Sequence, residues 1–240
     1  MDKANVNVKV DSTEGVVTIV TGERELLKEK SKQAIKLSGV LQAPSDFLAG
    51  RKDKYNDLET HLEIYKSEGK LVLVIHEDVH TTHQVTGSLS LDANLRDFKI
   101  NEEKQWTVQE LKKFILARGF FFDNPAEATQ LINNLNSFTA KVNVLIKEHN
   151  SNDGNSLLQL ETKVNGIEMK REFTLNIPIY QGYEKKKFKV NIGFEPTSTA
   201  VLLFLYSEDL ALLVHSEREK IVDNELSKFA DNTFSKVLLS

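Results

Sequence analysis

Alternating apolar and polar residues predict several short strands in the first half of the chain. Valines alternate with polar residues over 6–10, and a β-branched run at 16–20 follows a turn-like segment, which predicts an N-terminal hairpin. Residues 58–65 alternate in the same way, and after the sequence KSEGK the chain returns as LVLVIH. A third strand is expected over 84–91, so that these strands form a small antiparallel sheet.

Helix signals surround this sheet. Residues 23–37 are highly charged and rich in good helix formers, and they predict a short exposed helix that ends near Gly39. Ser45 is expected to cap a single helical turn that stops at Gly50.

A pair of helices is predicted in the middle of the chain. Thr107 and Glu110 have the spacing of a capping box, in which each side chain satisfies a backbone donor at the start of the helix. That helix should run to about Arg118. Asn124 as N-cap and Pro125 at the first helical position then start a second helix.

The second half of the chain changes to a period of two from Thr139 onward. The pattern predicts an antiparallel β-meander over 139–206 with about five strands, at 140–146, 158–164, 173–179, 188–194 and 200–206. Because the fifth strand is apolar on both faces, another element must cover its second face. Ser207 is a good N-cap for a C-terminal helix whose apolar residues recur at helical spacing, at Leu210, Leu213, Val214, Ile221, Leu226 and Phe229.

These elements predict an α+β fold in which the meander is packed by the C-terminal helix. A smaller N-terminal hairpin sheet and the central helix pair complete it. We expect residues 1–38 to be an appendage, with a hairpin and a charged helix, and residues 39–240 to form one α+β domain.

Composition narrows the possible functions. The 240 residues include 31 basic and 35 acidic side chains, a net charge of −4, which removes any global attraction to nucleic acids. The absence of cysteine excludes disulfides, thiolate nucleophiles and iron–sulfur clusters. Neither a signal peptide nor a membrane span is expected, so a cytoplasmic location without a cofactor is the simplest interpretation.

The segment IHEDVHTTH contains the H-E-x-x-H string of zinc proteases, with His76, Glu77 and His80, and His83 follows. Two histidines at this spacing reach one zinc ion only on a helix, because on a strand they lie roughly 13 Å apart. The surrounding residues are strand formers, so we expect a hairpin with three solvated imidazoles. A metal site at His76, His80 and His83, or a zinc hydrolase that uses Glu77, stays an alternative.

One basic segment is interleaved with aromatic residues. Lys185, Lys186 and Lys187 lie between Tyr183 and Phe188, in a predicted hairpin loop. The lysines could contact phosphates while a ring stacks on a base, as in single-strand binding proteins. A charged loop that prevents sheet-to-sheet aggregation is the simpler interpretation. Phosphate loops, nucleophile elbows and dinucleotide fingerprints are missing, so no catalytic residue is assigned.

Three stretches resemble the YfdQ-like family of uncharacterised bacteriophage and prophage proteins. They are residues 43–48 (APSDFL), the aromatic-headed helix 106–114 and residues 177–182 (IPIYQG), together with the predicted five-strand second half. The resemblance would cover about residues 40–235 and leaves out the first 35 residues and the histidine string. It implies a phage or prophage accessory protein in the host cytoplasm, without catalytic residues to transfer.

The sequence therefore predicts a non-enzymatic accessory protein that acts by binding or by self-assembly. Exposed edges of the meander would let one copy add its strand to the sheet of another, which predicts a homo-oligomer. A nucleic acid, or a protein of the host or the phage, is the alternative partner. The first alternative is a single-strand nucleic-acid-binding protein of a phage replication or recombination cluster, and the second is the zinc hydrolase.

Overall fold

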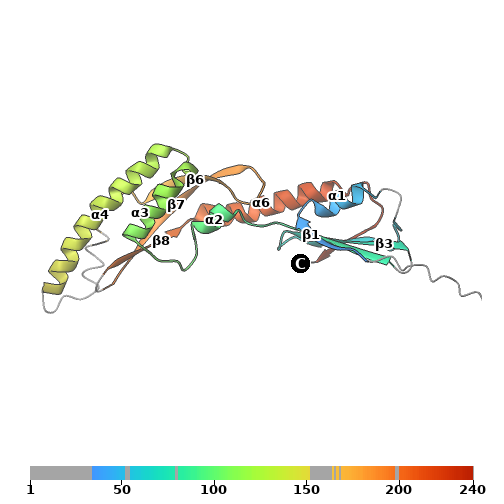
Figure 1. Ribbon diagram of the computed structural model, residues 1–240, viewed down its shortest axis with the longest axis horizontal. Coiled ribbons are helices and arrows are strands. Elements are labelled where there is room, and N and C mark those ends of the chain that lie inside the picture. Colours follow the sequence, from blue (N-terminus) through green and yellow to red (C-terminus); the bar gives the residue numbers. More distant parts are fainter. Residues whose placement is uncertain are drawn as a thin grey trace, which may run out of the picture.

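Two β-sheets lie at opposite ends of an elongated molecule, and helix α6 (Glu208–Ser227) runs between them (Figure 1). The computed structural model describes residues 34–51, 55–78, 81–151, 164, 166–167, 169–197 and 200–239. The architecture is α+β with mostly antiparallel sheets, which confirms the predicted fold class. No helix within these ranges is long and apolar enough to cross a membrane.

The five-stranded sheet has the order β1-β4-β3-β2-β9. Its central strands are joined by hairpins, as predicted, whereas β1 and β9 run parallel to their neighbours. The expectation of a smaller sheet was wrong, because a strand before the hairpins and a strand after the C-terminal helix join it. The strands are β1 (Lys36–Val40), β2 (His61–Tyr65), β3 (Lys70–Asp78), β4 (Thr81–Ser88) and β9 (Ser235–Leu239).

Strand β1 corrects the end of the predicted charged helix. Lys36 and Leu37 belong to this strand, since their backbone pairs with β4 rather than with a helical turn. The predicted hairpin over 6–20 and the rest of the helix, up to residue 33, lie outside the described residues. The predicted domain boundary after residue 38 falls inside β1.

One face of this sheet is apolar because every second residue of β2, β3 and β4 points to it. Leu62, Leu71, Leu73 and Ile75 are fully buried there. Figure 1 shows α1 (Ala43–Ala49) and the end of α6 over this face. A side chain at Gly87 would place its Cβ 2.6 Å from the Leu41 carbonyl oxygen, so the close approach of the chain before α1 requires glycine.

Helix α1 begins earlier than predicted. Gln42 is its N-cap, and Ser45, which the sequence assigned to that role, lies inside the helix. The Ser45 hydroxyl is used elsewhere: it donates to the Gln42 carbonyl oxygen and to the carboxylate of Glu225. The helix ends before Gly50, as predicted.

The four-stranded sheet has the order β5-β8-β7-β6 and is antiparallel throughout. Its last three strands in the chain confirm the third, fourth and fifth strands of the predicted meander. Its strands are β5 (Trp106–Thr107), β6 (Glu172–Pro178), β7 (Lys185–Pro196) and β8 (Val201–Tyr206). Its helices are α2 (Ala93–Asp97), α3 (Val108–Arg118), the 3-10 turn η1 (Gly119–Phe121) and α4 (Pro125–Ser151).

The first strand of the predicted meander, at 140–146, is wrong: these residues belong to α4. The buried residues Leu131, Leu135, Phe138 and Val142 are three or four positions apart, so the apolar stripe of the helix continues through the segment. The predicted strand over 158–164 lies outside the described residues except for Val164. The meander therefore has three described strands.

The C-terminal helix packs on the strands, as predicted, and contacts β7, but it does not cover the second face of β8. It leaves the end of β8 and continues toward the other sheet (Figure 1). On the uncovered face, Leu202 and Phe204 are partly exposed and Tyr206 is exposed. The helix instead connects the two sheets, which contribute to one hydrophobic core.

Strands β1 and β9 are the two edges of the five-stranded sheet, and no other described strand pairs with the outer side of either. All residues of β1 and the first four of β9 are exposed. On β9, Leu238 is 67% exposed and Val237 is 41% exposed. Leu58, which is 95% exposed, lies near the start of β9, because its neighbour Asp57 accepts a hydrogen bond from Thr233. Exposed apolar side chains thus gather at this edge.

Candidate binding site

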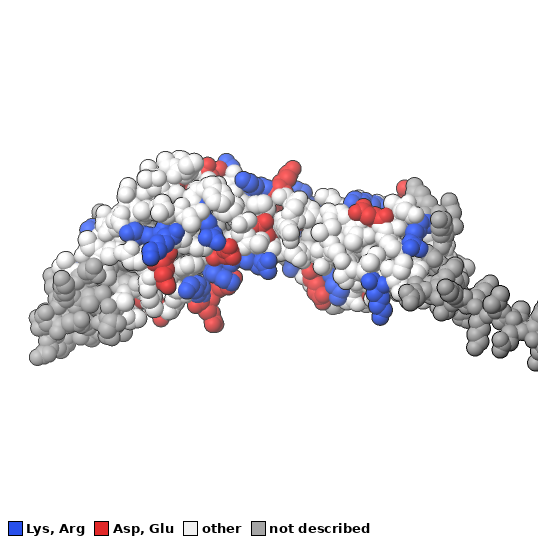
Figure 2. Space-filling model, in the orientation of Figure 1, with Lys and Arg blue, Asp and Glu red and all other residues white. Residues whose placement is uncertain are grey.

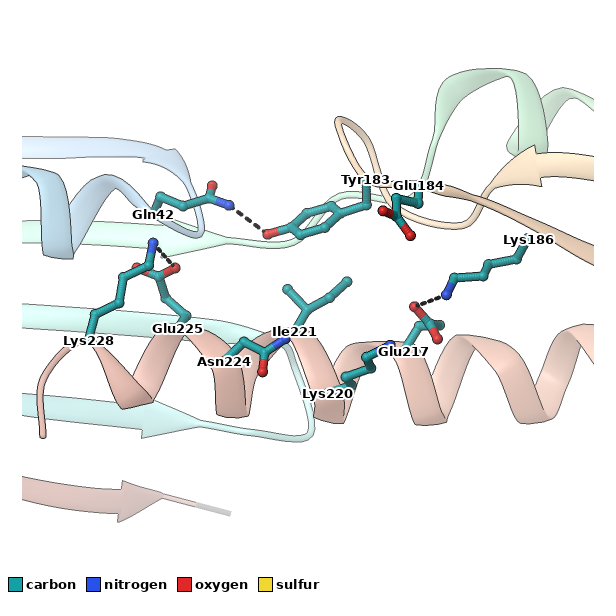
Figure 3. A pocket seen from close by; sticks show the side chains of 10 residues that line it. All are labelled: Gln42, Tyr183, Glu184, Lys186, Glu217, Lys220, Ile221, Asn224, Glu225 and Lys228. Atoms are coloured by element: carbon teal, nitrogen blue, oxygen red, sulfur yellow. Dashed lines mark hydrogen bonds and ion pairs between the residues drawn. The ribbon is translucent and has the colours of Figure 1, made fainter.

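A cleft of about 410 Å³ lies where the two sheets approach each other. Figure 3 shows α6 along one side and the turn between β6 and β7 on the other. The volume falls within the range of small-molecule sites. The lining residues are Gln42, Tyr183, Glu184, Lys186, Glu217, Lys220, Ile221, Asn224, Glu225 and Lys228.

Helix α6 supplies one wall of this cleft. Its lining residues recur every three or four positions from Glu217 to Lys228, so they share one face of the helix. The start of the helix is held firmly: the Ser207 hydroxyl accepts from the Leu210 backbone N–H, which confirms the predicted N-cap. The Asn101 amide also bonds the backbone N–H and carbonyl of Ser207, both at 2.8 Å.

The turn between β6 and β7 supplies the opposite wall. Gly182 has φ = +83°, a conformation that glycine adopts without strain. The Gln181 N–H donates to the Ser90 carbonyl, and the Asp92 N–H donates to the Ile179 carbonyl. These bonds join the turn to the segment that leads from the five-stranded sheet to α2.

One end of the cleft contains a buried carboxylate. Glu225 is 3% exposed, and it accepts a hydrogen bond from the Ser45 hydroxyl. Its other oxygen forms an ion pair with the Lys228 ammonium at 2.7 Å. A buried carboxylate needs such partners because its desolvation is costly.

At the other end, the Lys186 ammonium forms an ion pair with Glu217 at 3.2 Å (Figure 3). Between the two ion pairs lie Glu184, Lys220 and Asn224. Within the described part of the chain, these three side chains have no hydrogen bond or ion pair. They are therefore the groups that a bound molecule could engage without breaking an existing contact.

Tyr183 links the turn between β6 and β7 to the N-cap residue of α1. Its hydroxyl accepts a hydrogen bond from the Gln42 side-chain amide at 2.9 Å. Burial raises the pKa of Tyr183 above its ordinary value, with a smaller contribution in the same direction from the charge of Glu225. The phenol is therefore neutral at pH 7 and has its own proton to donate. The cleft can thus offer neutral donors beside charged groups of both signs.

The predicted basic segment is not a loop. Lys185, Lys186 and Lys187 begin strand β7, because the turn is completed before Glu184. Lys186 pairs with Glu217, and Lys187 pairs with Asp123 at 2.8 Å.

The aromatic residues that flank this segment have other contacts. Phe188 is 3% exposed and belongs to the core, and the hydroxyl of Tyr183 faces Gln42. On the side of the molecule that Figure 2 shows, acidic and basic residues are interspersed over the described surface. Of the three lysines, chiefly Lys185 could therefore contact a phosphate. The Phe188 ring is buried, so it cannot stack on a base.

His76 and His83 lie in the predicted hairpin and not on a helix. His76 is in β3 opposite Thr82, and His83 is in β4 opposite Ile75. Because opposite residues share a face, His76 and His83 point to opposite sides of the sheet. His80 lies outside the described residues. Among the side chains that the structure describes, no group of three possible metal ligands occurs.

The expectation that all three imidazoles are solvated is wrong for His83. Its side chain is buried at 3% exposure, packs edge-on against Phe47, and accepts the Ile35 backbone N–H at Nδ1 with a distance of 3.0 Å. Strand alternation gives the reason, since His83 occupies the same face as Val85.

The cleft residues on α6 were missed by sequence reasoning. The sequence predicts the helix but not which charged residues face a second element. The signal was the recurrence of Glu217, Ile221 and Glu225 at intervals of four, which places an apolar residue between carboxylates on one face. Nothing in the sequence pairs that face with Tyr183.

No known protein family, no curated protein and no solved structure matches this chain.

Proposed function

We propose that this chain is a non-enzymatic binding protein that self-associates through the β9 edge of its five-stranded sheet. The observation that supports the proposal is the exposure of Val237 and Leu238 on β9, a strand with no described partner on its outer side, with the exposed Leu58 near its start. An edge of this kind presents a row of unpaired backbone groups to another strand.

Antiparallel pairing of two β9 strands about Val237 is the arrangement that we favour. It would set Lys236 of each copy beside Leu238 of the other, so that the two ammonium groups are not opposed. A two-fold axis perpendicular to the sheet would keep both helix-covered faces on the same side. Such a contact is isologous, so the assembly would close as a dimer.

The edges of the meander are less suited to this role than the sequence suggests. Phe122 forms a bridge with Leu175, and the Asp123 N–H donates to the Thr174 carbonyl, so the outer side of β6 is partly occupied. The other edge strand, β5, has only two residues. Strand β1 is the remaining competitor, with Leu37 and Val40 exposed.

Sedimentation velocity over a wide concentration range tests the proposal. We expect a concentration-dependent dimer, and we expect Leu238→Lys to weaken it at least about tenfold, because each new ammonium would lie beside Lys236 of the other copy. The matched control is Leu212→Lys, at an equally exposed leucine of α6, which should leave the dimer unchanged. A strict monomer, or a dimer weakened by Val40→Lys and not by Leu238→Lys, would contradict it.

The phage or prophage setting and the host cytoplasm are part of the same proposal. Their support is the resemblance of residues 43–48, 106–114 and 177–182 to the YfdQ-like family. The identity of the neighbouring genes tests this, because a host metabolic operon would imply different partners from a phage replication cluster.

Nucleic-acid binding through Lys185–Lys187 is a weaker alternative, since Lys186 and Lys187 are already ion-paired. This alternative would be supported if the protein binds single-stranded nucleic acid with an affinity that falls steeply with salt and is lost in Lys185→Glu. The zinc hydrolase has no geometric support, because His76 lies on a strand.

A further inference from the structure

We infer that the cleft along α6 binds a small zwitterion, either an amino acid or a short peptide with free termini. This site is separate from the β9 edge, and the inference does not depend on self-association. It rests on the charges, the apolar surface and the size of the cleft.

The charges in the cleft are balanced. Three lysines and three glutamates line it, and two pairs of them neutralise each other at its ends. The remaining pair is Glu184 from the turn and Lys220 from α6, which come from opposite walls (Figure 3). A ligand with an ammonium near Glu184 and a carboxylate near Lys220 would satisfy both.

The middle of the cleft suits an uncharged side chain or peptide group. Ile221 is 7% exposed and forms an apolar floor between the charged residues. The Tyr183 hydroxyl can donate its proton, because it already accepts from Gln42, and the Asn224 amide can donate and accept. These groups match the carbonyl and N–H of a peptide bond.

The space extends beyond a single amino acid. A hollow of about 320 Å³ adjoins the cleft at Lys228, and a smaller one of about 120 Å³ adjoins it at Tyr183. Each hollow shares one lining residue with the cleft, and the cleft's own volume of about 410 Å³ is within the range of small-ligand sites.

Other ligand classes fit less well. A phosphorylated ligand would meet the carboxylates of Glu184, Glu217 and Glu225 as well as the lysines, so repulsion would offset attraction. A divalent cation would have to displace Lys186 or Lys228 from its carboxylate. Neither cost applies to a zwitterion.

Isothermal titration calorimetry of the full chain with Gly-Leu, N-acetyl-Gly-Leu and Gly-Leu-amide tests the inference. We expect Gly-Leu to bind, and we expect each blocked derivative to bind about tenfold more weakly, since each lacks one charge-assisted contact. In Lys220→Gln, Gly-Leu and its amide should bind equally. In Glu184→Gln, Gly-Leu and its N-acetyl derivative should bind equally.

The matched control is Lys113→Gln, at an exposed lysine of α3, which should bind all three peptides as the parent does. Far-UV circular dichroism of each variant verifies that it is folded. Absence of Gly-Leu binding to the folded parent, or equal binding of Gly-Leu and its two blocked derivatives to the parent, would overturn the inference. Because the titration is analysed at concentrations where the chain is monomeric, its result is independent of the dimer.

Discussion

His76 and His83 show how strand alternation separates two histidines of one hairpin. His83 points into the core beside Phe47 and accepts a backbone N–H, whereas His76 is on the other face, with Thr82 Oγ1 at 3.2 Å from its Nδ1. The two histidines therefore lie on opposite faces of the sheet, and the imidazole of His83 stabilises the core.

Replacing the two histidines should therefore have different consequences. We expect His83→Ala to lower the free energy of unfolding by about 2 kcal/mol, because it removes a buried ring and leaves the Ile35 N–H without its acceptor. His76→Ala should change it by less than about 0.5 kcal/mol. Urea denaturation of both variants gives the comparison, and equal losses would show that the assignment of His83 to the core is mistaken.

The capping box of α3 stabilises its element through purely local contacts. Thr107 Oγ1 accepts the Glu110 N–H at 3.2 Å, and the Glu110 carboxylate accepts the Thr107 N–H at 2.8 Å. Two hydrogen bonds lower the pKa of Glu110 below its ordinary value of 4.5. The larger contribution comes from the Thr107 backbone N–H and the smaller one from the Thr107 hydroxyl.

The lowered pKa makes the contribution of Glu110 depend on pH. A carboxylate with a depressed pKa in the folded state stabilises the fold above its unfolded pKa, and the contribution is lost as the pH falls through the folded value. Between about pH 6 and pH 3, Glu110→Gln should therefore lose less stability than the parent. Chemical denaturation at both values measures this.

Glu103→Gln is the control for that comparison. Glu103 is an exposed carboxylate in the same segment, with no ion pair or hydrogen bond among the described residues, so its replacement should leave the pH dependence unchanged. Identical pH dependence of the parent and Glu110→Gln would contradict the role of the capping box.

At the scale of the whole molecule, α6 is the element that joins two sheets. Leu210, near its start, is buried at the four-stranded sheet, while Ile221 and Val222 are buried toward the five-stranded sheet. The Lys66–Asp223 ion pair at 2.8 Å adds a polar contact to the β2–β3 turn. Neither sheet retains its full core without this helix.

This connection predicts a single cooperative unfolding transition. Trp106 is the only tryptophan and lies in β5, so its fluorescence reports on the four-stranded sheet alone, whereas far-UV circular dichroism reports on both. The two urea transitions should coincide, as two-state unfolding requires. Separate midpoints for the two signals would show that the sheets unfold independently.

The sequence by itself determined the elements whose signals are local. The caps at Thr107 and Ser207 and the hairpins of β2–β3–β4 and β6–β7–β8 were predictable because their hydrogen bonds involve residues close in the chain. The predicted strand at 140–146 failed because alternation and helical spacing coincide over so short a run, and only the buried stripe from Leu131 to Val142 distinguishes them.

Only the tertiary structure decided which elements share a sheet and which side chains share a cleft. β1 and β9 flank hairpins far from them in the sequence, and Tyr183 meets Gln42 across 141 positions. Such pairings depend on burying apolar faces of separate elements together, and the pattern within one element does not specify its partner. The cleft therefore arises from the way α6 joins the two sheets, because its charged face becomes a wall only where Tyr183 and Glu184 oppose it.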